Sequence, residues 1–134
     1  MIGLIVGLIV LLAYPVAWIA AFLRMIKPSH PETDAPTVRG RDAVVLQAVG
    51  MGFFMLTLVF GAVGSSVANE DLGAAAFSYV IAHMVICYWS LYCAWQAAGR
   101  GEARHWPMLA LGLGGAAWIF VGSVTLALFV ATQL

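Results

Sequence analysis

His83 is the residue in this sequence with the clearest capacity for chemistry, because it lies near the middle of residues 72–99, a run without Asp, Glu, Lys or Arg. An imidazole can ligate a haem iron or the magnesium of a chlorophyll, hydrogen-bond a quinone, or relay a proton. Ionisable side chains deep in such apolar segments are costly and are functional candidates by default. We therefore take His83 as the candidate cofactor-binding residue.

A purely structural role for His83 is the competing interpretation. A neutral histidine can bond to a backbone carbonyl or to a hydroxyl such as that of Ser90, Thr57 or Tyr79, and buried histidines in helix bundles are commonly satisfied in this way. No second histidine lies inside a predicted span, so a bis-histidine haem within one chain is excluded. A ligand held by His83 alone would need a partner subunit or a five-coordinate pigment. The identity of any cofactor stays open.

Other chemical patterns are weak or absent. His30, Glu32 and Asp34 alternate in a proline-containing segment, but without a fourth ligand they predict a solvated linker and no metal site. The sequence contains no Gly-x-Ser-x-Gly, phosphate loop or His-Glu-x-x-His motif. Its predicted membrane spans contain no acidic residue. Coupled transport normally relies on Asp or Glu near the membrane midplane. We therefore expect no catalytic residue and no ion-coupled transport.

The elements that must position these residues are membrane-spanning helices. Only 9% of the residues are charged and 63% are apolar, whereas soluble domains have about 25% charged residues. Four runs contain no Asp, Glu, Lys or Arg, at residues 1–23, 43–69, 72–99 and 105–134. Each is longer than the roughly 20 apolar residues that cross a bilayer. The sequence predicts an all-α integral membrane protein, a single domain whose four transmembrane helices cover about 2–26, 43–68, 72–99 and 106–132, with a cytoplasmic loop at 27–42.

Orientation follows from the basic residues. Four Lys and Arg residues surround the first connection, none lies in the second and two lie in the third. The positive-inside rule then places the first and third connections in the cytoplasm and both termini outside. The short connection around Glu70 makes the second and third helices an antiparallel hairpin. We expect an up-down bundle, N-out and C-out, in a bacterial inner membrane.

Small residues form one stripe along the second predicted helix. They recur at spacings of seven, four, three and four residues, at Gly50, Thr57, Gly61, Gly64 and Ala68. Such stripes let membrane helices approach closely, since packing drives their association. The stripe predicts a helix-packing face inside the bundle and not a substrate groove.

Composition also limits the kinds of partner that the chain can bind. The net charge is zero and no basic run exceeds Arg39-Gly40-Arg41, which removes the electrostatic footprint of nucleic-acid binding. Almost no chain lies outside the predicted spans. Our leading hypothesis is a small, non-catalytic subunit of a larger membrane complex, respiratory or photosynthetic. In the lipid bilayer it would pack against other membrane subunits or against copies of itself.

The layout of four spans, both termini outside and the largest basic loop first resembles that of the MAPEG superfamily, the small integral membrane glutathione transferases and eicosanoid enzymes. The resemblance covers the whole chain and is one of layout. Its members hold glutathione with Arg, Asn and Glu at the start of the second helix, and the matching segment here, residues 39–48, has arginines but no Asn or Glu. The resemblance implies, as the alternative function, a membrane enzyme that acts on lipophilic substrates with glutathione.

Overall fold

Four long helices make up nearly all of this chain in the computed structural model, which describes residues 2–27 and 32–133, without the side chains of residues 4, 11, 124–126, 128–129 and 132–133. The helices are α1 (Ile2–Ile26), α2 (Val38–Val67), α3 (Glu70–Gly99) and α4 (His105–Gln133), and no strand occurs among the described residues. Each contains a segment long and apolar enough to cross a membrane. The chain thus has the all-helical character of a multi-pass integral membrane protein, as predicted.

Three helices begin earlier than the uncharged runs predict. α2 begins at Val38 instead of 43, α3 at Glu70 instead of 72, and α4 at His105 instead of 106. Charged residues end a hydrophobic run, but they do not end a helix that continues into water. The first turn of α2 even carries an i,i+3 ion pair, with Arg39 Nη1 3.7 Å from Asp42 Oδ2.

The side chain of Asn69 sets the start of α3. Its Oδ1 accepts hydrogen bonds from the backbone N–H groups of Asp71, at 3.0 Å, and Leu72, at 3.4 Å. Amide and carboxylate side chains at this position satisfy donors that the first helical turn leaves free. The acidic residues of that turn, Glu70 and Asp71, also lie at the positive end of the helix dipole.

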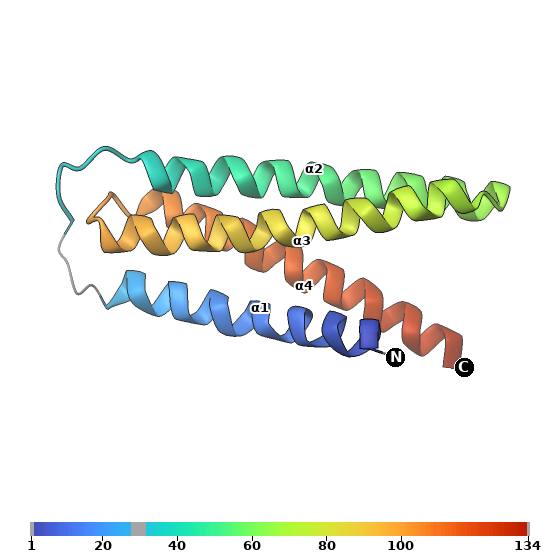
Figure 1. The fold of residues 1–134 in the computed structure, drawn as a ribbon. Helices are drawn as coiled ribbons and strands as arrows, with labels where there is room; N and C mark the ends of the chain where they lie inside the picture. The colour runs from blue at the N-terminus through green and yellow to red at the C-terminus, as the bar shows by residue number, and fades with distance from the viewer. Residues whose placement is uncertain (1, 28–31, 134) are drawn as a thin grey trace.

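α2 and α3 lie side by side along their length (Figure 1). Ala68 takes a left-handed conformation with φ 52°, and the N–H of Asn69 returns to Gly64 O at 3.0 Å. At Gly64 the two helices approach so closely that an added Cβ would lie 3.1 Å from Leu72 Cβ and 3.2 Å from the backbone nitrogen of Gly73. Any side chain at this point of the hairpin would therefore push the two helices apart by a few tenths of an ångström.

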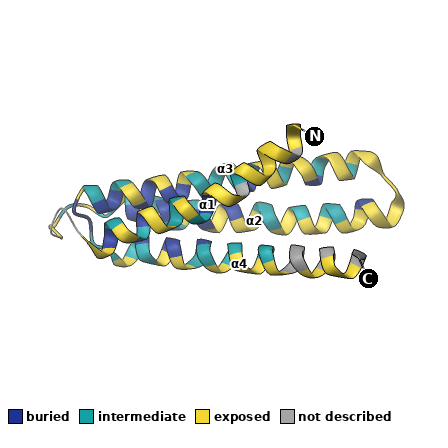
Figure 2. Ribbon diagram, turned by 90° about the horizontal axis from the view of Figure 1, so that it is seen from below, coloured by how far each residue is buried: buried dark blue, intermediate teal, exposed yellow. Residues whose placement is uncertain are grey.

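α1 and α4 pack against the hairpin mainly at the end where the long connection lies. Buried residues gather in that half of the molecule (Figure 2). Its core consists of Tyr14, Ala21, Met25, Ala43, Cys87, Leu91, Cys93, Ala94, Ala98, Ala110 and Leu111. In contrast, the described side chains of residues 2–9 are all exposed, and α4 diverges from α2 and α3 toward the C-terminus (Figure 1). The bundle is thus closed at one end and open at the other.

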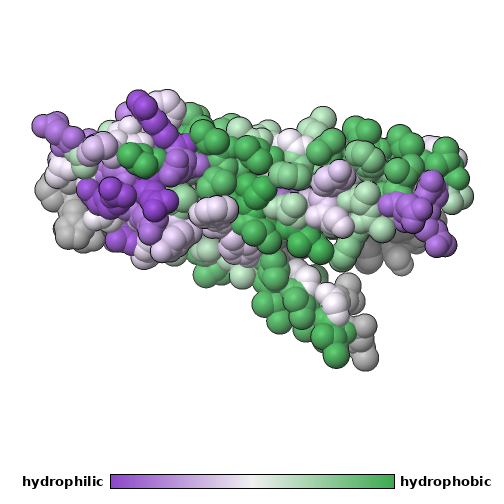
Figure 3. Space-filling view, turned by 45° about the horizontal axis from the view of Figure 1, so that its top comes forward, coloured by the Kyte–Doolittle hydropathy of each residue, from purple (hydrophilic) through white to green (hydrophobic). Residues whose placement is uncertain are grey.

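Glu102 holds the closed end together. Its side chain is fully buried, with 0% exposed, and its Oε1 accepts a hydrogen bond from the N–H of Gly40 at 3.1 Å. Arg104 Nη1 donates to Met25 O at 2.8 Å, which joins the end of α1 to the start of α4. Hydrophilic residues cluster at this end and in a smaller group at the opposite end, with a broad apolar band between them (Figure 3).

We expect Gly64→Leu to destabilise the hairpin, because the new side chain would collide with Leu72 and with the backbone of α3. Overpacking of this kind typically costs about 1–3 kcal/mol. The free energy of unfolding in detergent micelles measures the effect. Gly52→Leu on the same helix is the matched control, since nothing lies within 4 Å of a Cβ at position 52. Equal stability of the two variants would contradict the close approach at Gly64.

Candidate functional site

His83 is buried between α2 and α3, with 9% of its surface exposed. Its Nδ1 lies 2.7 Å from the backbone oxygen of Gly50. A carbonyl can only accept, so Nδ1 is the donor, and in the tautomer with a single proton Nε2 is left as an acceptor. Of the partners considered from sequence, the backbone carbonyl is the one used. Ser90 and Thr57 donate elsewhere, to Ala43 O and Phe53 O at 2.7 and 3.0 Å.

Cys87 and Gln47 extend this bond into a small polar cluster across the hairpin. Cys87 follows His83 by one helical turn, and its Sγ lies 3.7 Å from both ring nitrogens. Gln47, one turn before Gly50 on α2, donates from Nε2 to the same sulfur at 3.9 Å. The thiol can in turn donate to His83 Nε2, which satisfies the remaining ring nitrogen. The hairpin therefore meets the hydrogen-bonding needs of His83 from within.

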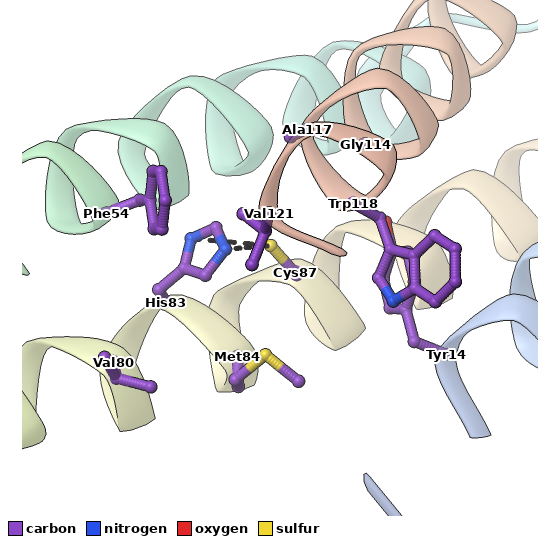
Figure 4. A pocket seen from close by; sticks show the side chains of 10 residues that line it. All are labelled: Tyr14, Phe54, Val80, His83, Met84, Cys87, Gly114, Ala117, Trp118 and Val121. Atoms are coloured by element: carbon purple, nitrogen blue, oxygen red, sulfur yellow. Dashed lines mark hydrogen bonds between the residues drawn. The ribbon is translucent and has the colours of Figure 1, made fainter. Parts of the chain in front are cut away.

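A cavity of about 290 Å³ adjoins this cluster (Figure 4). Its volume is close to the lower limit of small-molecule sites, which run from about 300 to 1,000 Å³. Small residues of α4 leave the space, and aromatic and aliphatic side chains form most of the wall. The lining residues are Tyr14, Phe54, Val80, His83, Met84, Cys87, Gly114, Ala117, Trp118 and Val121.

Two further cavities border the first. One of about 280 Å³ lies between α2 and α4 and shares Phe54, His83 and Ala117 with it. Another of about 260 Å³ lies between α1 and α4 and shares Tyr14 and Trp118. All three surround the turn of α4 at which this helix leaves the hairpin, so the divergence of α4 creates the space.

Two buried polar atoms on residues that line the cavity lack a partner. Tyr14 is only 3% exposed, and neither its hydroxyl nor the Nε1 of Trp118 makes a hydrogen bond within the described part of the chain. By comparison, Nε1 of Trp18 donates to Leu111 O at 2.8 Å. The Tyr14 hydroxyl points at the backbone of Gly114, where an added Cβ would lie 2.5 Å from it.

Sequence reasoning missed both Tyr14 and Trp118. Tyrosine and tryptophan are usually found at the membrane surface, where the ring is apolar and the polar tip is wet. Here each lies well inside its uncharged run. That unusual depth is the signal that could have identified them.

Three glycines of the small-residue stripe, Gly50, Gly61 and Gly64, lie on the side of α2 that faces α3. A Cβ on Gly50 would lie 3.5 Å from His83 Nδ1, and one on Gly61 would lie 3.9 Å from Ala76 Cβ. Thr57 is half-buried on the same helix, and Gly64 makes the close approach described above. Ala68 is exposed and caps the helix in a left-handed conformation, so it contributes to the turn and not to the packed face.

The described part of the first loop, residues 32–37, belongs to no group of side chains placed to hold a metal ion. His30, one of its three candidate ligands, lies outside the described residues, while Glu32 is exposed, with its Oε1 3.9 Å from Arg104 Nε. Across residues 2–27 and 32–133, no group of three or more His, Cys, Asp and Glu side chains is placed to hold a metal ion.

No family model, no curated protein and no solved structure matches this chain. The function is therefore inferred from the cavity and from the helix faces themselves.

We expect His83→Leu to lower the free energy of unfolding by about 1 kcal/mol, in the range measured for hydrogen bonds between membrane helices. His83→Gln should retain most of the stability, because its amide can still donate to Gly50 O. Unfolding in mixed micelles distinguishes the three proteins, with the lipid-facing Val85→Leu as control. Leu and Gln variants of equal stability would show that the bond to Gly50 contributes nothing.

Proposed function

We propose that this chain is a non-catalytic integral membrane subunit whose four helices cross the membrane up and down and pack against other membrane helices in a larger assembly. The observation that carries the proposal is the open half of the bundle. There α1 and α4 separate from the α2–α3 hairpin and expose apolar faces (Figures 1 and 2).

Packing energetics explain why an open half favours a protein partner. Lipid tails are as apolar as the helix faces, so the association of membrane helices depends on van der Waals fit and not on hydrophobic exclusion. Small residues allow the closest fit. Gly3 and Gly7 on α1 and Gly122 on α4 have nothing within 4 Å of an added Cβ. These glycines present smooth faces on which a neighbouring helix can pack.

The orientation in the proposal comes from the charges. All six Lys and Arg residues belong to the first and third connections or the helix ends beside them, at the closed end of the bundle. The positive-inside rule places that end in the cytoplasm. The turn around Asn69 and both termini then face outward, in the inner membrane of a bacterial cell.

The glutathione-dependent alternative would place its ligand at the start of α2. The arginines of that segment already interact with their own neighbours. Arg39 pairs with Asp42, and the guanidinium carbon of Arg41 lies 5.5 Å from the ring centroid of Trp106. These contacts favour the non-catalytic proposal.

Cysteine labelling tests the orientation. In a background with Cys87→Ala and Cys93→Ala, Asn69→Cys should react with a membrane-impermeant maleimide added to intact cells. Thr37→Cys should react only after the membrane is broken. Labelling of Thr37→Cys alone in intact cells would reverse the assignment.

Site-specific photo-crosslinking tests the assembly. A benzophenone amino acid at Leu8 or Phe120, on the open faces of α1 and α4, should form an adduct with a second membrane protein chain in native membranes. Val59 on α2 is the control, since it is exposed to lipid outside the opening. Mass spectrometry of the adduct distinguishes a second copy of this chain from a different subunit. A chain that stays monomeric at both open positions would contradict the proposal.

A further inference from the structure

We propose that the cavity beside His83 binds a lipophilic molecule through a carbonyl oxygen, with Tyr14 and Trp118 as its hydrogen-bond donors. This site goes beyond the assembly role proposed above and does not depend on it, because one chain supplies every residue of the wall.

The unpartnered atoms suit a ligand that carries a hydrogen-bond acceptor. An indole N–H can only donate, and a tyrosine hydroxyl donates readily to a carbonyl. His83 and Cys87 are already satisfied within the hairpin. The unpartnered groups on the lining residues, the Trp118 Nε1–H and the Tyr14 hydroxyl, can both donate. Leaving such a group unpaired in an apolar medium is costly, and a bound carbonyl removes that cost.

The depth of the site limits the source of the carbonyl. Tyr14 lies twelve residues from either end of α1, which corresponds to about 18 Å along the helix axis. It therefore lies near the middle of a hydrocarbon core about 30 Å thick. Phospholipid headgroups lie at the surface, so the occupant must carry its own carbonyl into the core. The ring of a membrane quinone and a freely diffusing acyl ester both have this chemistry.

The neighbouring cavities suit a molecule with an apolar tail. The head lies among Tyr14, Trp118 and His83 in the central cavity, and a tail can leave between α1 and α4 or between α2 and α4 through the two that border it. The rings of Phe54 and Trp118 stand on different sides of the central space (Figure 4). Aromatic walls of this kind pack well against a flat ring.

Direct binding to the full chain in quinone-free lipid nanodiscs tests the proposal. The probes are radiolabelled decylubiquinone, which has the quinone carbonyls, methyl oleate, which has an ester carbonyl, and decylbenzene, which has none. We expect saturable binding of a carbonyl probe and only non-specific partitioning of decylbenzene, as in empty nanodiscs. Binding of decylubiquinone alone identifies a quinone site, and binding of methyl oleate alone identifies an acyl-ester site.

Variants then assign the binding to the cavity. Tyr14→Phe removes one donor and keeps the ring, and Trp118→Phe removes the other donor and leaves a smaller aromatic ring. Each should weaken binding about fivefold, the equivalent of one hydrogen bond. Ala117→Leu fills the central cavity and should abolish binding. Tyr92→Phe and Ala48→Leu, on exposed positions, are the controls for Tyr14→Phe and Ala117→Leu.

Three results would overturn the proposal. The first is saturable binding of decylbenzene equal to that of the carbonyl probes, and the second is binding that Ala117→Leu leaves unchanged. The third is the lack of saturable binding of either carbonyl probe to the wild-type chain. Thermal unfolding of each variant confirms that a loss of binding is not a loss of the fold. The crosslinking result at Leu8 and Phe120 does not enter this test, so the two proposals can fail separately.

Discussion

The hydrocarbon core of a bilayer offers no hydrogen-bond partner, and this constraint governs how the helices meet. Four polar side chains inside the apolar runs donate to the backbone carbonyl of another helix: Ser90 to Ala43, His83 to Gly50, Trp18 to Leu111, and Tyr88 to Val10. The first two join α3 to α2, the third joins α1 to α4, and the fourth joins α3 to α1. Side-chain donors thus supply directional contacts that packing alone does not. Together with the buried Glu102, they explain why the helices are tightly packed in the half near the long connection.

The departure of α4 from the hairpin produces the two features on which the proposed ligand binding and the proposed assembly are based. Up to Leu111 one face of this helix is buried against its neighbours, at Pro107, Ala110 and Leu111, while Ile119 and Phe120 are exposed. In the turn between them, small residues fail to fill the space beside His83, which leaves the cavity with two unmet donors. Beyond that turn the same divergence exposes the helix faces that a partner can cover. Ligand binding and assembly are therefore separate proposals with a common structural origin.

The sequence predicted the parts of this structure that depend on the bilayer. Long uncharged runs identify spans because their length must match the apolar core, and an unpaired imidazole is too costly to face lipid, so an inward His83 followed from its depth. Its partner, Gly50 O, depends on the relative rotation of two helices, which a single sequence does not encode locally. The early start of α2 at Val38 was missed because hydropathy marks the edge of the membrane and not the end of a helix. Tyr14 and Trp118 were missed because their role depends on where α4 diverges.

A partner helix and a bound molecule would also influence one another. The cavity between α1 and α4, lined in part by Tyr14, Trp118 and Ile119, lies at the start of the opening between these helices. A neighbouring helix packed into that opening would cover this exit, and it would hold α1 and α4 at a fixed separation. If the assembled chain binds the ligand more tightly, the ligand-bound chain must bind its partner more tightly by the same factor, because coupling between two binding equilibria is reciprocal. The divergence of one helix thus provides a physical route by which occupancy at membrane depth can alter assembly.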